Sequence, residues 1–398
     1  MEPFGTTDTV FIEIGCSQEN KAGNFVCGDT FLSHKNKNNS AYLSVLSDGL
    51  GSGIKANVLS TMTASMAMNF LQQNEPIVRS AISILNTLPM DSVRNVSYAT
   101  FSLASIDNDG ETTIVEFDNP SFLLFREKIN IKPQKEKVLL PNSPEHRIIR
   151  ISKLKLFKGD RIILFSDGVN QSGIGRNEYP FGWDNDGVEE FVQGQIDVHP
   201  DISAHDLAKC IVRQAIKNDR FIPKDDISCA VIYLRDPRRL LICSGPPFNN
   251  EKDEFLASTV DNYPGKTIIC GGTTSQIIAR ELHRQIQIDL DIPIGDLPPS
   301  AKIKGVNLVT EGILTLGAVA EILENNPSLD SPPDNPAGNI VKRIRESDMI
   351  DLMVGTRINE AHQDPSLPVE LEIRRNVIKK IAFLLEDKYL KKVRLQFI

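Results

Sequence analysis

The chain has 398 residues, and we expect two domains because single hydrophobic cores rarely grow beyond about 250–300 residues. Hydrophobic residues make up 40% and charged residues 24% of the chain, which is typical of a soluble globular protein. The formal net charge of −8 and the lack of a basic block argue against nucleic-acid binding, since nucleic-acid phosphates are bound by clustered Lys and Arg.

The sequence also argues against membrane insertion and secretion. No run approaches the roughly 18 apolar residues of a membrane-spanning helix, and residues 1–15 lack the basic start and apolar centre of a signal peptide. The six cysteines are scattered without a Cys-x-x-Cys pair, and most lie in apolar segments. We therefore expect reduced thiols, no zinc site, no membrane partner and a cytoplasmic location.

The N-terminal part of the chain predicts three strands. Residues 10–16 alternate apolar and small side chains, and residues 25–33 form a second β-prone segment that carries Asp29. Residues 41–46 are mostly apolar and predict a buried strand. The polar residues between the second and third strands have the composition of a hairpin turn.

The third strand runs into the sequence Ser-Asp-Gly-Leu-Gly-Ser-Gly, which places Asp48 at a strand end. Gly49 and the glycines after it permit a sharp turn and a close approach of the backbone to a ligand. A long apolar helix is expected to follow, from residue 55 to about residue 71. A carboxylate held at a strand end suits a divalent cation, although Asp-Gly is also a very common turn dipeptide.

The next segments predict consecutive strands. Residues 97–106 and 112–118 form a hairpin across an acidic turn, Asp-Asn-Asp-Gly. This turn resembles the beginning of a calcium loop, but Asp-Gly hairpins are far more frequent, so we predict a turn. A further strand is expected at residues 121–125 and another hairpin at residues 132–150.

Residues 161–165 repeat the earlier design, because an apolar strand again runs into Ser-Asp-Gly, with Asp167 as the carboxylate. Residues 170–186 then predict a glycine-rich loop that contains the only tryptophan, Trp183. A helix is expected at residues 204–218.

Asp225 and Asp226 precede the last β-prone run of this region, so acidic residues stand at four expected strand ends and none is expected within a helix. Two cations that share ligands need such a convergence of short Asp side chains from different strands. The sequence therefore offers a candidate two-cation site built from these two residues together with Asp29, Asp48 and Asp167.

Beyond a charged linker at residues 235–239, the pattern changes to alternating strands and helices. Such alternation predicts an α/β domain with a mainly parallel sheet. We place the domain boundary between residues 236 and 237. The expected strands are residues 240–243, 266–270, 306–309, 350–354 and 391–397, and the expected helices end near residues 283, 323 and 386.

Small and polar residues follow four of these strands, and open α/β sheets bind ligands at the carboxyl ends of their strands. One such turn leads into a helix whose free N–H groups would favour an anionic small molecule, with Glu311 and Arg357 from neighbouring strand ends beside it. The alternative is that Thr273 merely caps the helix and the glycines allow close packing. The candidate anion site consists of Gly271, Gly272, Thr273, Thr274 and Glu311.

Four motifs of the first domain resemble, in order, those of the metal-dependent (PPM) serine/threonine phosphatases. They are Gly28-Asp29, the Ser47–Gly53 motif, Ser166-Asp167-Gly168 and Asp225-Asp226-Ile227-Ser228. The Gly-Ser-Gly after Asp48, followed by Lys55-Ala56, is most similar to the bacterial sporulation stage II E (SpoIIE) branch. The resemblance extends from about residue 8 to residue 235.

This resemblance implies that residues 1–236 form an αββα sandwich of two antiparallel sheets. Together with the smaller α/β domain that the strand–helix alternation predicts at residues 237–398, the expected fold class is α+β. The resemblance also implies two Mn²⁺ or Mg²⁺ ions in the cleft between the sheets. Asp48 would bridge the ions, the Gly49 carbonyl would complete one shell, and Asp29 would bind directly or through a water. Asp167 and Asp225 would hold the second ion, and Asp226 is the less certain member of its pair.

The implied function is a phosphatase that hydrolyses phosphoserine or phosphothreonine on a bacterial regulatory protein. A metal-bound hydroxide would attack the phosphorus in line, with Asp48 and Asp167 as the essential carboxylates and no covalent enzyme intermediate. In this family the region around residues 170–186 carries a mobile flap, while the composition alone equally fits a surface loop.

The chain departs from the eukaryotic branch in two places. Leu50-Gly51 stands where that branch has a histidine after Asp-Gly-Gly, and Asn24 stands where it has a phosphate-binding arginine. No general acid can be named, and we expect low turnover unless a partner orders the site by shifting the helix after Gly53. The alternatives are a silent phosphatase fold whose C-terminal domain senses a metabolite, and a small-molecule phosphatase; the retained aspartates count against the first.

Overall fold

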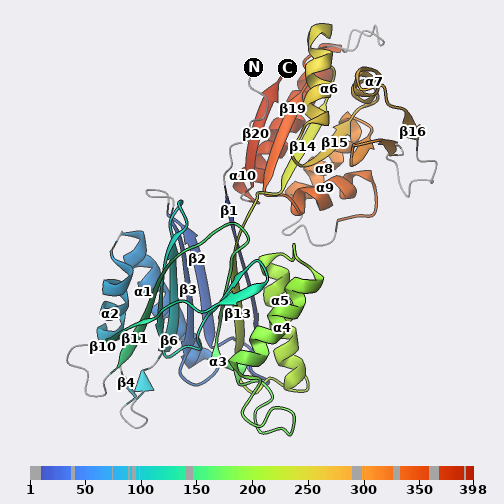
Figure 1. Cartoon of the computed structure of the whole chain (residues 1–398). Helices are drawn as coiled ribbons and strands as arrows, with labels where there is room; N and C mark the ends of the chain where they lie inside the picture. The colour runs from blue at the N-terminus through green and yellow to red at the C-terminus, as the bar shows by residue number, and fades with distance from the viewer. Residues whose placement is uncertain are drawn as a thin grey trace. The chain divides into compact units, whose positions relative to one another are not determined.

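A computed structural model describes the chain at residues 10–36, 41–73, 75–87, 90–91, 96–97, 99–139, 147–288, 298, 300–325, 332–357, 367–389 and 391–398. The chain divides into two compact units, Val10–Asp236 and a second that contains Pro237–Ile398 (Figure 1). No helix among these residues is long and apolar enough to cross a membrane. The hairpin turn expected before the third strand lies partly outside the described residues.

The first unit contains two antiparallel sheets. One has five strands in the order β1-β13-β12-β8-β9, and the other has six in the order β10-β11-β7-β6-β3-β2. The strands of the five-stranded sheet are β1 (Phe11–Glu19), β8 (Leu123–Arg126), β9 (Ile129–Ile131), β12 (Arg161–Phe165) and β13 (Ile227–Arg235). Those of the six-stranded sheet are β2 (Asp29–Lys35), β3 (Tyr42–Gly49), β6 (Ala99–Ile106), β7 (Glu111–Phe117), β10 (Glu136–Leu139) and β11 (Ile148–Lys155), and a separate ribbon pairs β4 (Met90–Asp91) with β5 (Val96–Ser97).

Helices cover the outer faces of both sheets (Figure 1). The first two helices pack on the six-stranded sheet, and the fourth and fifth pack on the five-stranded sheet. The predicted αββα sandwich of two antiparallel sheets is therefore confirmed. The helices are α1 (Ile54–Gln72), α2 (Ile77–Thr87), α3 (Asp167–Asn170), α4 (Asp184–Val198) and α5 (Ala204–Asn218).

Side-chain alternation along the strands separates the core between the sheets from the cores under the helices. In β3, Val45 packs under the helices, whereas Leu46 joins Ile162 and Ile232 in the layer between the two sheets. Asp48 lies two residues beyond Leu46, so it belongs to the face that points toward the opposite sheet. The alternation that predicts the strand thus also sets the direction of its terminal carboxylate.

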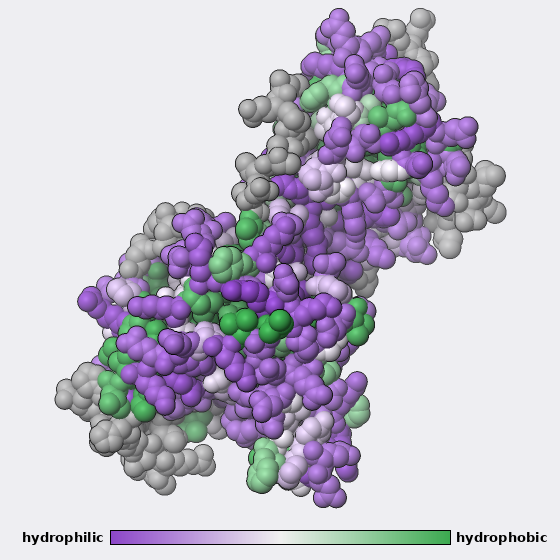
Figure 2. Space-filling view, in the orientation of Figure 1, coloured by the Kyte–Doolittle hydropathy of each residue, from purple (hydrophilic) through white to green (hydrophobic). Residues whose placement is uncertain are grey.

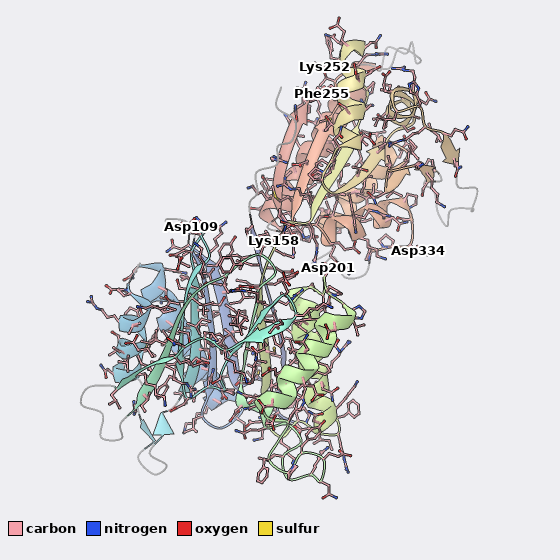
Figure 3. The ribbon with its side chains drawn as sticks, in the orientation of Figure 1. Asp109, Lys158, Asp201, Lys252, Phe255 and Asp334 are labelled. Carbon is pink, nitrogen blue, oxygen red and sulfur yellow. The ribbon has the colours of Figure 1, made fainter. Side chains whose placement is uncertain are left out.

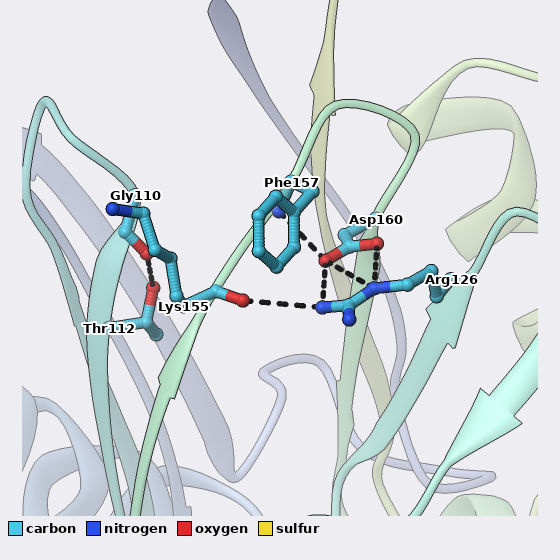
Figure 4. Close-up of polar contacts among 6 residues, drawn as sticks. All are labelled: Gly110, Thr112, Arg126, Lys155, Phe157 and Asp160. Carbon is cyan, nitrogen blue, oxygen red and sulfur yellow. Dashed lines mark hydrogen bonds and ion pairs between the residues drawn. The ribbon is translucent and has the colours of Figure 1, made fainter.

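An ion pair with a buried carboxylate fixes the turn between β11 and β12 (Figure 4). Asp160 is fully buried, and Arg126 of β8 donates to it from Nε at 3.0 Å and from Nη2 at 2.9 Å. The backbone N–H of Phe157 donates to the same carboxylate at 2.9 Å, and Arg126 also donates to the Lys155 carbonyl at 3.2 Å. Removing the Arg126 side chain would leave the buried Asp160 carboxylate without its cationic partner, so the pair orders this end of the sandwich.

The acidic segment between β6 and β7 is a tight hairpin turn. Asp109 is exposed at its tip, as Figure 3 shows, and the Gly110 N–H donates to the Asp107 carbonyl at 2.9 Å. The two strands pair in antiparallel register from Ser102 opposite Glu116 onward. The predicted hairpin is therefore confirmed.

The second unit is built on a seven-stranded sheet in the order β16-β17-β18-β15-β14-β19-β20. The strands from β18 to β20 are parallel, and β16 and β17 add an antiparallel edge, so the predicted mainly parallel sheet is confirmed. The strands are β14 (Arg239–Ser244), β15 (Lys266–Cys270), β16 (Ile286–Ile288), β17 (Ala301–Ile303), β18 (Leu308–Thr310), β19 (Met349–Val354) and β20 (Lys392–Phe397). The helices are the 3-10 turn η1 (Asn250–Lys252), α6 (Asp253–Asp261), α7 (Gly272–Glu281), α8 (Ile313–Asn325), α9 (Pro336–Arg345) and α10 (Leu367–Asp387).

The parallel strands of this unit are covered by helices on both faces. Leu240 and Ile242 of β14 pack with α8, α9 and α10, whereas Leu241 and Cys243 pack with α6 and α7. The five parallel strands lie in the order third, second, first, fourth, fifth along the chain, which is the doubly wound arrangement of open α/β sheets. The surface seen in Figure 2 is mainly hydrophilic, as the composition predicts.

Candidate metal centre

The segments that carry the predicted aspartates meet at one edge of the sandwich. Asp29 begins β2 and lies opposite Asp48 of β3 in antiparallel register. The Gln18 side chain joins the two sheets here, because its Nε2 donates to the Ser228 hydroxyl at 2.9 Å and to the Asp29 carbonyl at 3.3 Å. Residues far apart in the sequence are thereby brought to one place.

Asp29 is a buried carboxylate without hydrogen-bond partners. It is 3% exposed, and neither side-chain oxygen has a partner among the described residues. Burial raises the pKa of Asp29 to about 7; the nearby hydroxyls of Ser228 and Ser166 oppose the shift, and the charge of Asp226 adds to it. Such a group is costly to ionise unless a cation or a donor approaches it.

The raised pKa of Asp48 indicates that the predicted metal ligands lie close to one another. Burial raises its pKa well above the usual range, and the charges of Asp29, Asp167 and Asp225 raise it further, in that order. Three other aspartates therefore act on this one side chain. The structure thus brings together residues from β2, β3, the end of β12 and the start of β13.

Asp167 corrects one expectation, because it lies within a helix. β12 ends at Phe165, and the chain turns at once into the short helix α3, with Ser166 as the N-cap and Asp167 in its first turn. A Cβ on Gly168 would lie 2.1 Å from the Asp226 carbonyl, so only glycine lets the chain pass β13 so closely. Burial raises the pKa of Asp167, and the Gln171 amide donates to its Oδ2 at 3.1 Å and opposes that shift.

Asp225 and Asp226 have different surroundings. Asp226 is 4% exposed, accepts the Lys21 backbone N–H at 3.0 Å through Oδ1, and has no partner for Oδ2 among the described residues. Asp225 is half-buried, and the Lys21 ammonium lies 3.9 Å from its Oδ1. Burial raises the pKa of Asp225, and the charge of Asp167 adds to the shift.

The turn after Asp48 is in close contact with α1. A Cβ on Gly49 would lie 2.0 Å from the Ala56 carbonyl, so the turn and the first part of the helix leave room only for glycine. On the other side, the Asn57 amide donates to the Cys27 carbonyl at 2.8 Å, two residues before Asp29. Any movement of α1 would therefore displace both the turn that follows Asp48 and the segment that precedes Asp29.

The donor set fits a hard divalent cation, because such cations bind carboxylate oxygens. Three buried carboxylate oxygens, two of Asp29 and one of Asp226, have no hydrogen-bond partner among the described residues. Among the described residues, however, no three acidic, His or Cys side chains converge closely enough to surround one ion. Burial is the main cause of the raised pKa values of Asp29 and Asp48, and the charges of neighbouring aspartates add to it.

Sequence reasoning missed four residues of this edge. The side chains of Gln18, Ser166 and Ser228 and the backbone and ammonium of Lys21 all contact or neighbour the aspartates. Period-two alternation predicts Ser228 on the same face as Asp226. Gln18 and Lys21 carry no such signal, because they approach from the end of β1 and the loop after it.

The predicted anion site lies where β15 passes into α7. Gly271 is the N-cap and makes no side-chain capping hydrogen bond, and Thr273 lies in the first turn of α7. A Cβ on Gly312 would lie 3.4 Å from Gly271 Cα, whereas a Cβ on Gly272 would meet nothing within 4 Å. The φ of +123° favours glycine at position 271, whereas neither backbone conformation nor packing requires glycine at position 272.

The charged neighbours of that turn already have partners. Glu311 accepts the Leu314 N–H at 3.2 Å and thereby caps α8, and Arg357 donates to the Asn250 side chain. Thr274 is buried at 1% exposed. An anion site at this turn stays a prediction.

Comparison with known proteins places these observations in a family. Residues 38–235 match the family described as "Stage II sporulation protein E (SpoIIE)". Relatives named Stage II sporulation protein E are 24% identical over 237 residues in Priestia megaterium and 27% identical over 171 residues in Bacillus subtilis (strain 168). The matches cover 58% and 42% of this chain but only 38% and 20% of those proteins.

Solved structures also show similarity to this chain. The phosphatase domain of SpoIIE from Bacillus subtilis, solved with a fragment of its regulatory domain, gives a TM-score of 0.47 at 19% identity, covering 57% of this chain and 63% of that one. RsbX in complex with magnesium gives a TM-score of 0.41 at 19% identity, covering 56% of this chain and 98% of that one.

Proposed function

The chain belongs, through residues 38–235, to the SpoIIE-type branch of the PPM phosphatases, and on that premise we propose that it is a divalent-metal-dependent phosphatase for phosphoserine and phosphothreonine in proteins. The observation that carries the proposal is that four aspartates lie close together at one edge of the sandwich. The charges of Asp29, Asp167 and Asp225 raise the pKa of Asp48, and the charge of Asp167 raises the pKa of Asp225. Buried carboxylate oxygens without partners need a cation there.

Two Mn²⁺ or Mg²⁺ ions, when bound, would activate a water and offset the charge on the phosphoryl oxygens. Asp29, Asp48 and the Gly49 carbonyl would hold one side of the pair. Asp167 and Asp225 would hold the other, and Asp226 would contribute its unpartnered Oδ2. The remaining side chains orient these ligands, as the Gln171 amide does for Asp167.

Exposed apolar side chains beside the aspartates support a protein substrate over a small phosphate ester. Phe25 is 99% exposed, Ile54 74% and Phe221 73%. Their segments are neighbours, because the Ala22 N–H donates to the Pro223 carbonyl at 2.9 Å and the Asn24 side chain lies near Gly53. Exposed apolar groups of this size gain by contact with the apolar surface of a partner.

The outer face of α1 supports control of this site by a partner. Ile54, Val58 and Met62 recur every four residues and are 74%, 56% and 48% exposed. The helix begins immediately after the Asp48 motif and contacts its turn through Ala56. We expect a partner on this stripe to move the helix and the turn together, and we expect low activity in its absence.

The test is hydrolysis of a phosphoserine peptide by the full chain with manganese, comparing Asp48→Asn with the control Asp109→Asn in the exposed hairpin turn. Manganese binding by calorimetry accompanies the assay. We expect Asp48→Asn to lose both hydrolysis and tight metal binding, while Asp109→Asn retains both. Parental hydrolysis by Asp48→Asn would contradict the metal assignment.

The same assay separates the alternative functions. Hydrolysis of p-nitrophenyl phosphate without any phosphopeptide hydrolysis would favour a small-molecule phosphatase. Manganese binding without hydrolysis of either substrate, with or without a partner, would favour a silent phosphatase fold whose second unit binds a metabolite.

A further inference from the structure

A cavity of about 720 Å³ lies on the first unit, between the loop after α3 and the face of α4 and α5. Four aromatic side chains line it: Tyr179, Phe181, Trp183 and Phe191. Phe181 is 87% exposed, whereas Trp183 is 6% exposed and packs edge-on against Phe191 with ring centroids 5.4 Å apart. The cavity therefore has a fixed aromatic floor and one aromatic ring standing free at its rim.

The remaining charge of this cavity is entirely negative. Glu178, Asp184, Asp186 and Glu190 line it, and no Lys, Arg or His does. No ion pair joins any of these four carboxylates to a basic side chain of the described residues, and Asp184 accepts only the Gly187 N–H at 2.7 Å. Four carboxylates around exposed aromatic rings repel anions and attract a cation that has an apolar stem.

A short chain of contacts connects this cavity with the metal centre. The backbone N–H of Trp183 donates to the Ser172 carbonyl at 2.9 Å, and the Asn170 side-chain amide donates to the Asn185 side-chain oxygen at 2.9 Å. Between these two anchors, the Gln171 amide donates to Asp167 Oδ2 at 3.1 Å. The cavity wall is thus built on the residues that directly follow a proposed metal ligand.

We propose that this cavity, here called the aromatic–acidic cavity, binds an arginine side chain of the protein substrate near its phosphorylated residue. The guanidinium would lie against the aromatic rings and between the carboxylates, and its aliphatic stem would contact Phe181. Only the identity of the partner rests on the proposed phosphatase function; the recognition of arginine follows from the lining itself. The specificity of the enzyme would then depend on basic residues beside the phosphorylation site.

Trp183 gives a direct measure of binding, because it is the only tryptophan of the chain and lies in the cavity wall. The full chain is titrated with an unphosphorylated Gly-Arg-Gly-Arg-Gly peptide and with the matched Gly-Gln-Gly-Gln-Gly peptide, and tryptophan emission is followed. We expect a saturable change with the arginine peptide only, weakened by added salt. Equal responses to both peptides, or none to either, would overturn the proposal.

Two variants and a matched control locate the site. Glu190→Gln and Phe181→Ala each change an exposed side chain of the cavity, and we expect each to weaken binding of the arginine peptide about fivefold. Glu189→Gln is the control, because Glu189 adjoins Glu190 on α4 but pairs with Lys132 and does not line the cavity. Equal affinity in all three variants and the parent protein would place the peptide elsewhere.

Kinetics then separate this proposal from the proposed function. With phosphoserine in each peptide, the parent protein should prefer the arginine peptide in kcat/KM by about fivefold, and Glu190→Gln should remove this preference without changing p-nitrophenyl phosphate hydrolysis. An unchanged preference in Glu190→Gln would contradict the cavity assignment. If no phosphopeptide is hydrolysed, the phosphatase proposal fails, and the fluorescence titration still decides whether the cavity binds arginine.

Discussion

The strand ends of the two units differ in how their polar groups are satisfied. At the aspartate edge of the first unit, both side-chain oxygens of Asp29 and one of Asp226 are buried and find no partner in the part of the chain that the structure describes. At the glycine-rich edge of the second unit, the backbone of Gly271 packs on Gly312, and Glu311 caps α8. Buried carboxylate oxygens without a partner are costly, which is a stronger sign of a ligand than the N–H groups at the start of a helix.

The two edges also differ in the charge of the ligand that each would bind. The first edge concentrates carboxylates, so a cation is the ligand that we propose for it. The second edge offers backbone N–H groups of α7 at Gly272, which favour an anion but are also common at the start of any helix. The two sites therefore predict effects of very different size when one residue is changed.

The largest effect is expected at Asp167. Asp167→Asn keeps the hydrogen bond to Gln171 within reach but removes one charge from the ligand set, so we expect kcat/KM for a phosphopeptide to fall more than about a hundredfold. Manganese affinity, measured by calorimetry, should fall in parallel. If the variant is active and its manganese affinity is unchanged, Asp167 is not a metal ligand and the aspartate edge does not need a cation.

The second effect is a pH dependence of the metal-free protein. The pKa of Asp29 is about 7 in the folded chain and close to 3.8 when unfolded, so its folded form holds more protons and stability must fall as pH rises through about 7. We expect Tm without metal to be roughly 3 °C or more lower at pH 8 than at pH 5.5. Saturating manganese should reduce or reverse this difference, because the cation binds the ionised carboxylate. The same Tm at both pH values without metal would show that the pKa of Asp29 is not raised in the folded protein.

A third, smaller effect tests the separation of the units. All the predicted metal ligands lie in Val10–Asp236, so a chain truncated after Asp236 should fold, bind manganese and hydrolyse p-nitrophenyl phosphate within about twofold of the full chain. Circular dichroism and calorimetry show whether it is folded and loaded with metal. A folded, metal-loaded but inert truncated chain would show that the second unit supplies part of the catalytic site.

The smallest effect on catalysis is expected at Gly272. A Cβ at this position meets nothing within 4 Å, so Gly272→Val should leave Tm and phosphatase activity almost unchanged. Thermal-shift measurements with inorganic phosphate and with carboxylate metabolites then test the glycine-rich edge. A stabilisation of the parent protein that the variant lacks would support an anion site; no stabilisation of either would leave only close packing.

Alternation in the strands made much of the first unit predictable. The residues that predict β12 and α5 are those that form them, and Leu46 and Ile162 face the interior that the pattern indicates. Three helices of this unit were missed, namely α2, α3 and α4. α4 begins within the segment interpreted as a loop and contains Gly187 and Gly194, which weaken a helical pattern, so its stability comes from packing on the five-stranded sheet.

In the second unit, the parallel strands were predictable, but the antiparallel edge was not. β16 and β17 are three residues each, too short for a periodic signal, and their pairing depends on the neighbouring strand β18. α9 was also missed, although Asn335 accepts the Gly338 N–H and Pro336 begins the helix, both of which are N-terminal signals.

The sequence by itself determined which side chains would form the candidate site, because strand periodicity and Asp-Gly turns are local and place Asp29, Asp48 and Asp225 at strand ends. Only the tertiary structure decided their burial and mutual charge, since these arise when two sheets bring residues some 200 positions apart into contact, as Gln18 and Ser228 do. The aromatic–acidic cavity likewise depends on packing: the loop after α3 and the helices α4 and α5 each carry part of it, and no local pattern indicates that they enclose one space.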